Sequence, residues 1–447
     1  MPSLPALLPL VFTGFGAVAA MLAAPRLPGV SRAIAAAVLL WAALALGSRL
    51  SAPPEASALL ADDGLSRLAG LLVCLSALGS LAFLHREGPG REGPALLLLA
   101  TLGGLVLAGA SHAASLFLGL ELVTLALVAL FVLPLTREAL EAGYKLLVLG
   151  AAAAATLLMG LALAHAATGL AGLSSLSARG MLVSLAAALL LAGLAFKLAL
   201  VPFHMWTPDA FSGAPQSAAA FAGAAAKIAV VAAIIRIDSL GPPEVWALGL
   251  ALFGGASILL GNLVALRQDG IARMLGYSSV GQAGYVAAVL GSGAPIAHQA
   301  GLFYIAVYAP ALLAALCVAA RLGPEATIAD LRGLAWRRPL AGGAAAIAFV
   351  SLAGLPVSAG FFGKFQVFTA LIEAQAWWLL AIALLGAGLG AYYYLRFVAA
   401  IFRRVPDPAE PTLSAAQGLA LTACSALILG LGLRPDLLLS PLRALLP

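Results

Sequence analysis

Long apolar runs recur along the whole of this 447-residue sequence, and they limit what it can fold into. A transmembrane helix needs about 20 consecutive apolar residues, and many of the runs are at least that long. No gap between the runs is large enough for a soluble domain. Only 9% of the residues are charged, whereas soluble domains have about 25%. We therefore predict an all-α polytopic membrane protein, since no alternating ten-residue pattern suggests a barrel.

The apolar runs define about 14 expected transmembrane helices. Cytoplasmic loops of membrane proteins are enriched in basic residues, which gives the orientation. With the first loop taken as cytoplasmic, thirteen arginines lie in cytoplasmic loops and six on the opposite side. An even number of spans then places both termini outside the cytoplasm. The expected spans are 5–24, 33–50, 66–84, 93–111, 113–134, 140–166, 180–205, 215–236, 243–265, 272–291, 296–320, 339–372, 376–402 and 412–433.

The loops use arginine as their only basic residue apart from histidine, and each of the four lysines lies in or at the edge of an expected span. A lysine near the middle of a bilayer costs at least about 2.5–3.5 kcal/mol on insertion scales. Buried lysines can lose their proton, whereas arginine stays protonated. Lysines confined to the membrane therefore indicate groups that exchange protons. The alternative is that a lysine at a helix end simply reaches the interface. The four are Lys145, Lys197, Lys227 and Lys364.

Acidic residues show a similar distribution. Of 18 Asp and Glu residues, only Glu121 lies well inside an apolar run, SLFLGLELVTLALVALFVL. Nothing in its local sequence neutralises it, so it requires a partner from another helix or an internal water. Glu141 lies near Arg137 at the start of the next span, where an acid is ordinary.

Two expected spans contain a proline close to a lysine. Pro202 follows Lys197 by five residues, and Pro356 precedes Lys364 by eight. Proline removes a backbone hydrogen bond from a helix and forces a kink or a break. Inside a membrane this is tolerated only where protein or water satisfies the freed carbonyls. We expect a helix break beside each of these lysines.

The two interrupted spans occupy matching positions of two five-span blocks, residues 93–242 and 243–404, in a single membrane domain of residues 1–447. Residues 1–92 and 405–447 flank the blocks. An odd number of spans per block gives the second block inverted topology, and interrupted helices in inverted repeats indicate an ion pathway. The secondary candidates for such a pathway are His204, Glu141, Lys145, Tyr277, Ser278 and Ser279.

Several segments resemble the antiporter-like subunits of respiratory complex I and related cation/proton antiporters. The main one is FKLALVPFHMWTPDAFSGAPQSAAAF followed by AAAKIA (196–229). The run AWWLLAIALLGAGLGAYYYLR (376–396) resembles subunit N of bacterial NADH:quinone oxidoreductase in particular. The similarity covers about residues 90–405. Further matches are FLGLELVTLALVAL (117–130), GNLVALRQDGIARMLGYSSVGQAGY (261–285), LRGLAWRRPLAGG (331–343) and SLAGLPVSAGFFGKF (351–365).

The resemblance implies roles for four residues of this sequence. Glu121 would be the acid of the fifth helix, and Lys197 the lysine of the broken seventh helix. Lys227 would be the relay lysine of the eighth helix, and Lys364 the exit-side lysine of the broken twelfth. Together they would form a proton relay.

The resemblance also implies a function. The chain would be a proton-translocating membrane-arm subunit of an NADH:quinone oxidoreductase in the bacterial inner membrane, driven by redox chemistry in partner subunits. It would hold no cofactor and no metal itself, and NADH, FMN, iron–sulfur clusters and quinone would belong to its partners. Its partners would be other membrane-arm subunits, including neighbouring antiporter-like subunits, with the lipid bilayer and protons but no nucleic acid. Both termini would be periplasmic.

Two alternatives stay open. A sodium/proton antiporter-type subunit, Mrp-like or hydrogenase-associated, would need hard oxygen ligands around its cation, and the sequence has a single mid-span acid. A non-pumping membrane spacer would only dock its neighbours through apolar faces. Sodium dependence tests the first alternative, and substitution of the polar residues tests the second.

Overall fold

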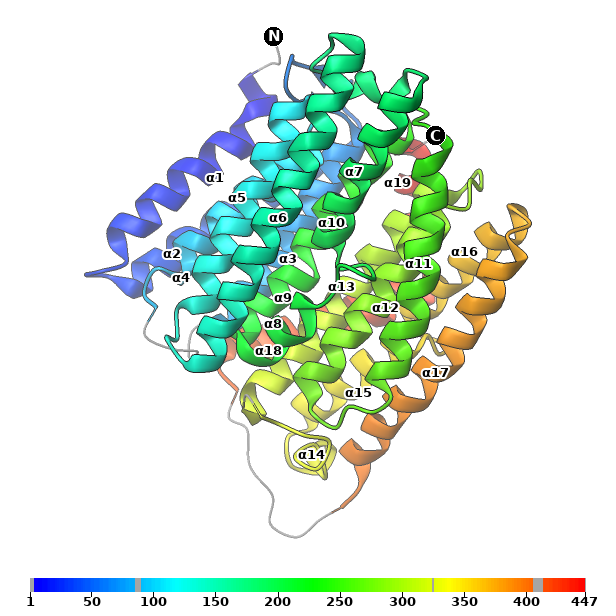
Figure 1. Cartoon of the computed structure of the whole chain (residues 1–447). Coiled ribbons are helices and arrows are strands. Elements are labelled where there is room, and N and C mark those ends of the chain that lie inside the picture. The colour runs from blue at the N-terminus through cyan, green and yellow to red at the C-terminus, as the bar shows by residue number, and fades with distance from the viewer. Residues whose placement is uncertain (1–3, 85–89, 324, 405–412, 447) are drawn as a thin grey trace. The chain divides into compact units, whose positions relative to one another are not determined.

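The computed structural model describes residues 4–84, 90–323, 325–404 and 413–446, and these residues are almost entirely helical (Figure 1). A two-stranded antiparallel hairpin, β1 (Glu55–Ala56) and β2 (Ala61–Asp62), and a short 3₁₀ helix, η2 (Leu173–Ser177), interrupt the helices. The helices are α1 (Leu4–Ala23), α2 (Pro28–Ser48), α3 (Gly64–Phe83), α4 (Gly93–Ala108), α5 (Ala113–Val132), α6 (Arg137–Thr168), α7 (Met181–Leu198), α8 (Trp206–Gly213), α9 (Gln216–Gly223), α10 (Ala225–Asp238), α11 (Glu244–Ala265), α12 (Ile271–Leu290), α13 (Ala297–Leu322), α14 (Leu334–Arg337), α15 (Pro339–Ala353), α16 (Ala359–Glu373), α17 (Trp377–Phe402), α18 (Ala415–Leu433) and α19 (Asp436–Leu445).

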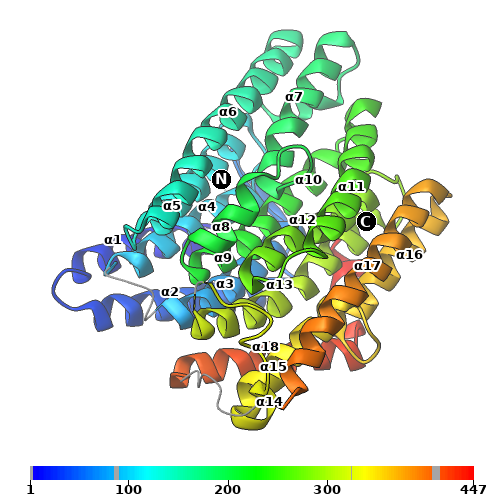
Figure 2. The same ribbon diagram turned by 60° about the horizontal axis from the view of Figure 1, so that its bottom comes forward.

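The helices form two compact units. Unit 1 contains Met1–Leu198 and Ala225–Leu250, and within it α4 packs along α5, α6 along α7, and α10 against α3 and α4. Unit 2 contains Ala199–Ala224 and Ala251–Leu445, and it is built around the buried helix α13, which packs against α12, α15, α16 and α18. In Figure 2, α14, α15 and α18 lie together in unit 2.

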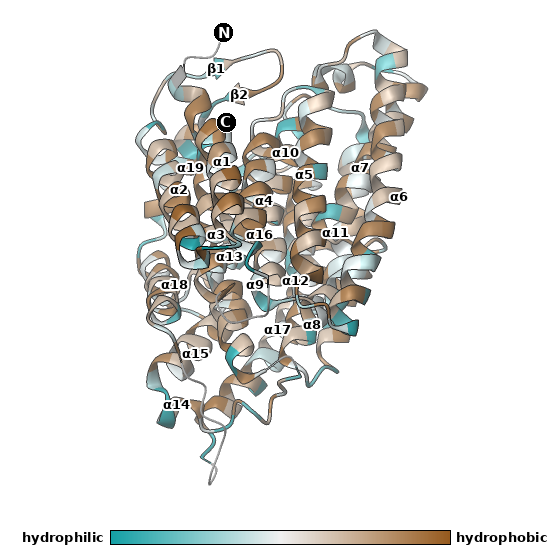
Figure 3. Ribbon diagram, turned by 90° about the vertical axis from the view of Figure 1, so that its left-hand side faces the viewer, coloured by the Kyte–Doolittle hydropathy of each residue, from teal (hydrophilic) through white to brown (hydrophobic). Residues whose placement is uncertain are grey.

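Apolar helices dominate the structure. Among the described residues, eleven helical segments are long and apolar enough to cross a membrane, and one of them, Gln216–Asp238, consists of α9 and α10 together. The expected spans outside these eleven are the 16-residue α4, the helix α12, and 339–372, which is divided into α15 and α16. Figure 3 shows hydrophobic colour along most helices, with much of the hydrophilic colour at their ends and connections. The prediction of an all-helical polytopic membrane protein is confirmed at this level.

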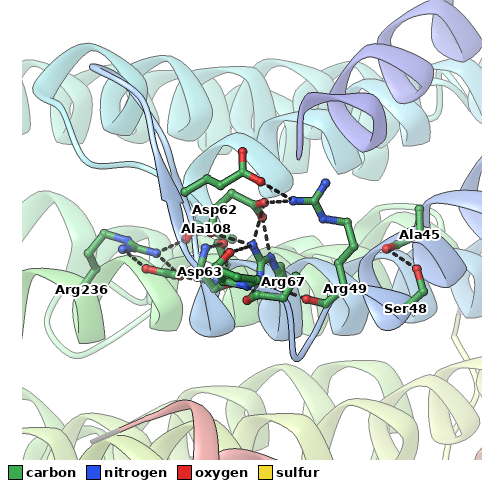
Figure 4. A network of polar contacts seen from close by, with 12 residues as sticks. Ala45, Ser48, Arg49, Asp62, Asp63, Arg67, Ala108 and Arg236 are labelled. Carbon is green, nitrogen blue, oxygen red and sulfur yellow. Dashed lines mark hydrogen bonds and ion pairs between the residues drawn. The ribbon is translucent and has the colours of Figure 1, made fainter. Parts of the chain in front are cut away.

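A charged network holds the connection between α2 and α3 (Figure 4). Arg67 is 1% exposed, and its Nε and Nη2 donate to the Asp62 carboxylate at 2.9 and 3.0 Å. Its remaining N–H groups donate to backbone carbonyls of the connection, including that of Pro53 at 2.8 Å. Arg49 donates to Asp62 and to Glu55 of the hairpin. A buried guanidinium with all its donors used therefore fixes this loop.

The same network reaches α10 through an ion pair. Asp63 accepts the backbone N–H of Ser66 as the N-cap of α3, and its carboxylate binds Arg236 of α10 at 2.7 Å. Burial acts to raise the pKa of Asp63, but the hydrogen bonds and charge of Arg236, with those of Ser66, outweigh it, so the pKa lies below its ordinary value. The pair ties the start of α3 to the last turn of α10.

Candidate functional site

Lys197 and Glu121 meet in unit 1, although 76 residues separate them in the sequence. Lys197 is the second-to-last residue of α7, and its Nζ lies 3.4 Å from Oε1 of Glu121 on α5. Nζ also donates to the hydroxyl of Thr124, which itself donates to the Leu120 carbonyl at 2.7 Å. Residues 121 and 124 share one face of α5 because they are three apart on a helix. A carboxylate and a hydroxyl therefore hold the ammonium group together.

This ion pair is largely removed from the surface. The Lys197 side chain is 9% exposed and that of Glu121 is 22% exposed. The surrounding segments of α5 and α7 are apolar, so the two charges attract each other more strongly than they would in water. Removal of one partner would leave a poorly solvated charge, which is strongly unfavourable. Changes in the distance between the two groups can therefore alter the stability of the charged lysine.

The chain leaves the helical conformation after α7. Ala199 has a positive φ of 63°, and the peptide bond before Pro202 is cis. Residues 199–205 are not helical, and α8 begins at residue 206. Within unit 2, the backbone N–H of Val201 donates to the Ser257 hydroxyl at 2.8 Å, and that hydroxyl donates to a carbonyl one turn earlier on α11. A serine thus satisfies a backbone donor that no helix uses. His204 is half-buried in the same stretch.

Lys227 is fully buried in unit 1. It lies on α10, whose residues from 225 to 235 are all buried, and α10 packs against α3, α4, α7 and α5. An ammonium group with 0% exposure has lost its hydration, so its charged form depends on polar groups inside the protein.

Lys364 occupies a second break, in unit 2. It lies on α16 with 5% exposure, and its Nζ donates to the carbonyl of Ala353, the last residue of α15, at 2.7 Å. Gly354 has a φ of +77°, and a Cβ there would lie 2.5 Å from Cδ of Lys364. Glycine is required at that position both by the conformation and by the space the lysine takes. The lysine therefore reaches the end of α15 only because residue 354 has no side chain.

The backbone of this second break is also satisfied by a serine. The N–H of Gly360, in the first turn of α16, donates to the Ser351 hydroxyl at 3.1 Å. A Cβ on Gly360 would lie 1.8 Å from the Ser351 carbonyl oxygen, so the two helices approach closely there. Pro356 lies between α15 and α16, and Val357 has a φ of +70°, a strained conformation for a β-branched residue.

Hydroxyl and amide groups surround Lys364. Tyr304 donates to Oε1 of Gln282 at 2.5 Å, and Nε2 of Gln282 donates to the Tyr394 hydroxyl at 3.2 Å. Tyr394 also shares a hydrogen bond with Ser278. Gln282, Tyr304 and Lys364 line one small cavity of about 10 Å³, close to the space that one water molecule needs. These residues form a buried hydrogen-bonded cluster beside Lys364.

The remaining secondary candidates lie elsewhere. Glu141 and Lys145 pair with each other at 2.6 Å on α6, with side chains 57% and 37% exposed. Tyr277 is half-buried, with its ring under the guanidinium of Arg273 at 5.9 Å. Ser279 is buried on α12. Among the described residues no group of three or more His, Cys, Asp and Glu side chains could hold a metal ion.

Sequence reasoning missed six polar residues of these sites: the two serines at the breaks, Ser257 and Ser351, and the side chains Thr124, Gln282, Tyr304 and Tyr394. Thr124 could have been predicted from the sequence, because a polar residue three positions after Glu121 lies on the same face of the helix. Gln282 could also have been predicted, as an amide in the middle of an expected span. The tyrosines could not, since tyrosine occurs equally in apolar cores.

Comparison with known proteins places the chain in a family. A family profile described as NADH:quinone oxidoreductase/Mrp antiporter, TM, matches residues 110–390. The curated NADH-quinone oxidoreductase subunit N of Cereibacter sphaeroides is 70% identical over 447 residues, which is 100% of both chains. The chain belongs to this family. The matched range includes Glu121, Lys197, Lys227 and Lys364.

Two solved structures have the same fold as this chain. A chain of respiratory complex I from Thermus thermophilus with bound aureothin is 36% identical, with a TM-score of 0.88 over 97% of this chain and 98% of that chain. A chain of the Mrp complex from Dietzia sp. is 21% identical, with a TM-score of 0.89 over 99% of this chain and 96% of that chain. The second likeness concerns the fold alone.

Proposed function

We propose that this chain is a proton-translocating membrane subunit of an NADH:quinone oxidoreductase. The observation that carries the proposal is the ion pair of Lys197 with Glu121, enclosed by apolar helices in a chain that matches subunit N over its full length. The chain would contribute proton transfer, while partner subunits carry NADH, FMN, iron–sulfur clusters and quinone. It would lie among other membrane-arm subunits, including neighbouring antiporter-like subunits, in the bacterial inner membrane.

In this proposal the ion pair is the switch of the relay. Close to Glu121, Lys197 holds its proton because the carboxylate stabilises the ammonium. When the two groups separate, or when charge changes in a neighbouring subunit, the proton moves to Lys227 and then to Lys364. A change of about 4 kcal/mol in the stability of a charged lysine shifts its proton affinity by about a thousandfold. The titrations of successive lysines would be coupled, so their proton affinities belong to the set.

The architecture we propose follows from the two breaks. The non-helical residues after Leu198 and after Ala353 support two inverted five-helix blocks, residues 93–242 and 243–404. Residues 1–92 and 405–447 would flank them in a single membrane domain of about fourteen spans, with both termini periplasmic. The secondary groups His204, Tyr277, Ser278 and Ser279 would line the pathway in this arrangement. The other two secondary candidates, Glu141 and Lys145, would lie outside it, because their side chains are 57% and 37% exposed.

The proposal is tested with the intact complex in proteoliposomes. We expect Glu121→Gln to lower NADH-driven quinone reduction and proton pumping together, equally with and without sodium. Glu141→Gln, which alters an exposed acid of α6, is the matched control and should change neither rate. Unchanged rates in Glu121→Gln would support the spacer alternative. Activity that requires sodium would support the sodium/proton antiporter alternative.

A further inference from the structure

A cavity with a basic lining lies at the corner between α14 and α15, in unit 2. It has a volume of about 260 Å³, and Arg337 and Arg338 form its polar side. Its other lining residues are Pro339, Leu340, Ala341 and Leu413. Figure 3 shows α14 with hydrophilic colour beside the end of the hydrophobic helix α15. The cavity therefore joins cationic groups to apolar surface, at a distance in sequence from every residue of the proton relay.

More positive charge surrounds this corner. Arg332, Arg403 and Arg404 are exposed, and the guanidinium of Arg404 lies 4.7 Å from the ring centre of Trp336 on α14. The nearby acid Asp330 binds the loop residue Thr327 through its carboxylate. Two further acids of the sequence, residues 407 and 410, lie outside the described residues. Even with all three acids counted, the five arginines leave the corner positive.

Two exposed aromatic residues next to the cavity lining, and the lining residue Leu340, give this corner apolar surface. Trp336 is 55% exposed, and its indole N–H donates to the Phe402 carbonyl at 2.8 Å. Phe402 is 47% exposed and Leu340 is 46% exposed. Tryptophan is enriched at the level of lipid headgroups, because its ring is apolar while its N–H needs a polar partner. The apolar surface of this corner thus matches the boundary between headgroups and acyl chains.

The start of α15 adds a further attraction for an anion. α15 is 15 residues long, and no side chain caps its first turn. The first N–H groups of a helix lack partners within the helix and carry partial positive charge. Residues 339–341 of this first turn also line the cavity.

We propose that this corner binds the phosphate-bearing headgroup of an anionic phospholipid. The guanidinium groups of Arg337 and Arg338 bind the phosphate, and the acyl chains lie along Leu340 and Leu413. A free phosphate ion would use the same basic groups, but it has no need of the exposed apolar surface beside them. The arginine distribution of the sequence places this corner on the cytoplasmic side, where such pockets bind anionic headgroups.

The test uses the intact complex in liposomes with photoreactive lipids. Diazirine-labelled phosphatidylglycerol and diazirine-labelled phosphatidylcholine are compared, and labelled peptides are mapped by mass spectrometry. We expect labelling of residues 334–342 by phosphatidylglycerol at least about fivefold above that by phosphatidylcholine. An excess of inorganic phosphate should not reduce it. Equal labelling by both lipids would overturn the proposal, and displacement by inorganic phosphate would assign the cavity to the free ion instead.

A pair of matched double variants sharpens this test. Arg337→Gln with Arg338→Gln should lower phosphatidylglycerol labelling to the phosphatidylcholine level. Arg26→Gln with Arg267→Gln removes the same charge from two exposed residues on the same predicted side, and it should leave labelling unchanged. Equal loss in both double variants would overturn a specific site. If the first variant fails to assemble, the comparison of lipids in the wild-type complex decides the proposal.

Discussion

The two lysine sites hold an ammonium group in apolar surroundings by different means. Lys197 has a charged partner, Glu121, and a hydroxyl from the same helix. Lys364 donates to the backbone carbonyl of Ala353, and its space is fixed by Gly354. The first site is made of side chains from two helices, whereas the second depends on how the backbone breaks.

The difference indicates how each site responds to change. A carboxylate can take up a proton or move away, so its support for the ammonium group can be withdrawn. A backbone carbonyl keeps its partial charge and its position, so it holds Lys364 in one place whichever protonation state it has. We infer that the Lys197 site is suited to switching and the Lys364 site to passing protons along a fixed path.

Apart from replacement of a buried lysine itself, the largest effect is expected at the second site, from Gly354→Ala. The left-handed conformation of residue 354 costs a non-glycine residue about 1–2 kcal/mol. The new Cβ would also lie 2.5 Å from Cδ of Lys364 and displace the lysine from Ala353. Proton pumping in proteoliposomes should fall at least about tenfold in a complex that still assembles.

A glycine on the same helix provides the control for that substitution. Nothing lies within 4 Å of a Cβ on Gly343 of α15. Gly343→Ala should therefore leave pumping intact and stabilise the helix by up to about 1 kcal/mol. Normal pumping in Gly354→Ala would show that the position of Lys364 does not matter.

The second-largest effect is expected at the ion pair of Lys197 with Glu121, whose two charges should be energetically coupled. A double-mutant cycle of Glu121→Gln and Lys197→Met, measured on turnover, should give a coupling energy of about 1–3 kcal/mol. The exposed pair of Glu141 and Lys145 is the reference cycle, and its coupling should be no more than about 0.5 kcal/mol. Equal coupling in the two cycles would contradict a special role for the buried pair.

A smaller effect is expected from the hydroxyl of the first site. Thr124→Val keeps the shape of the side chain but removes the acceptor for Lys197. Loss of a hydrogen bond worth about 1 kcal/mol should lower turnover about fivefold. Thr124→Ser keeps the hydroxyl and should stay near the wild-type rate. If serine and valine have the same effect, the hydroxyl is not what holds the lysine.

The smallest effect is expected outside the membrane segments, at the ion pair of Asp63 with Arg236. The pKa of Asp63 is lower in the folded protein than its ordinary value of 3.8, which applies to the unfolded chain. The ion pair therefore contributes its full stabilisation above pH 3.8, and this contribution is lost as pH falls through the pKa of the folded state. Asp63→Asn keeps an N-cap residue but loses the charge. The difference in Tm between wild type and Asp63→Asn, measured in detergent, should be constant near neutral pH and shrink below about pH 4. A difference that grows on acidification would contradict this sign.

The sequence predicted the residues of these sites better than their contacts. A lone acid and rare lysines stand out in apolar runs because charge is unfavourable there, and proline marks where a helix cannot continue. The helical membrane fold follows from the same apolar pattern and is confirmed. The number of fourteen spans stays a prediction, as does the relay itself.

The contacts could not be read from the sequence because they depend on which helices pack together. Glu121 required a partner from another helix, but only packing shows that Lys197 of α7 lies beside it. The carbonyl partner of Lys364 exists because α15 ends at Ala353, and the expected span 339–372 did not give that boundary. The packing of the helices decides which of many polar groups becomes the partner of each residue. The periodic pattern of apolar residues in the sequence does not contain that information.

Proton pumping by the Lys197→Met variant tests the account most directly. The intact complex would be placed in proteoliposomes, and NADH-driven quinone reduction and proton uptake would be followed together, with Lys145→Met as the control. The account predicts that an assembled Lys197→Met complex loses both activities in parallel while the control keeps them. Wild-type rates of both activities in Lys197→Met would contradict it, and Lys197 would then be a structural residue.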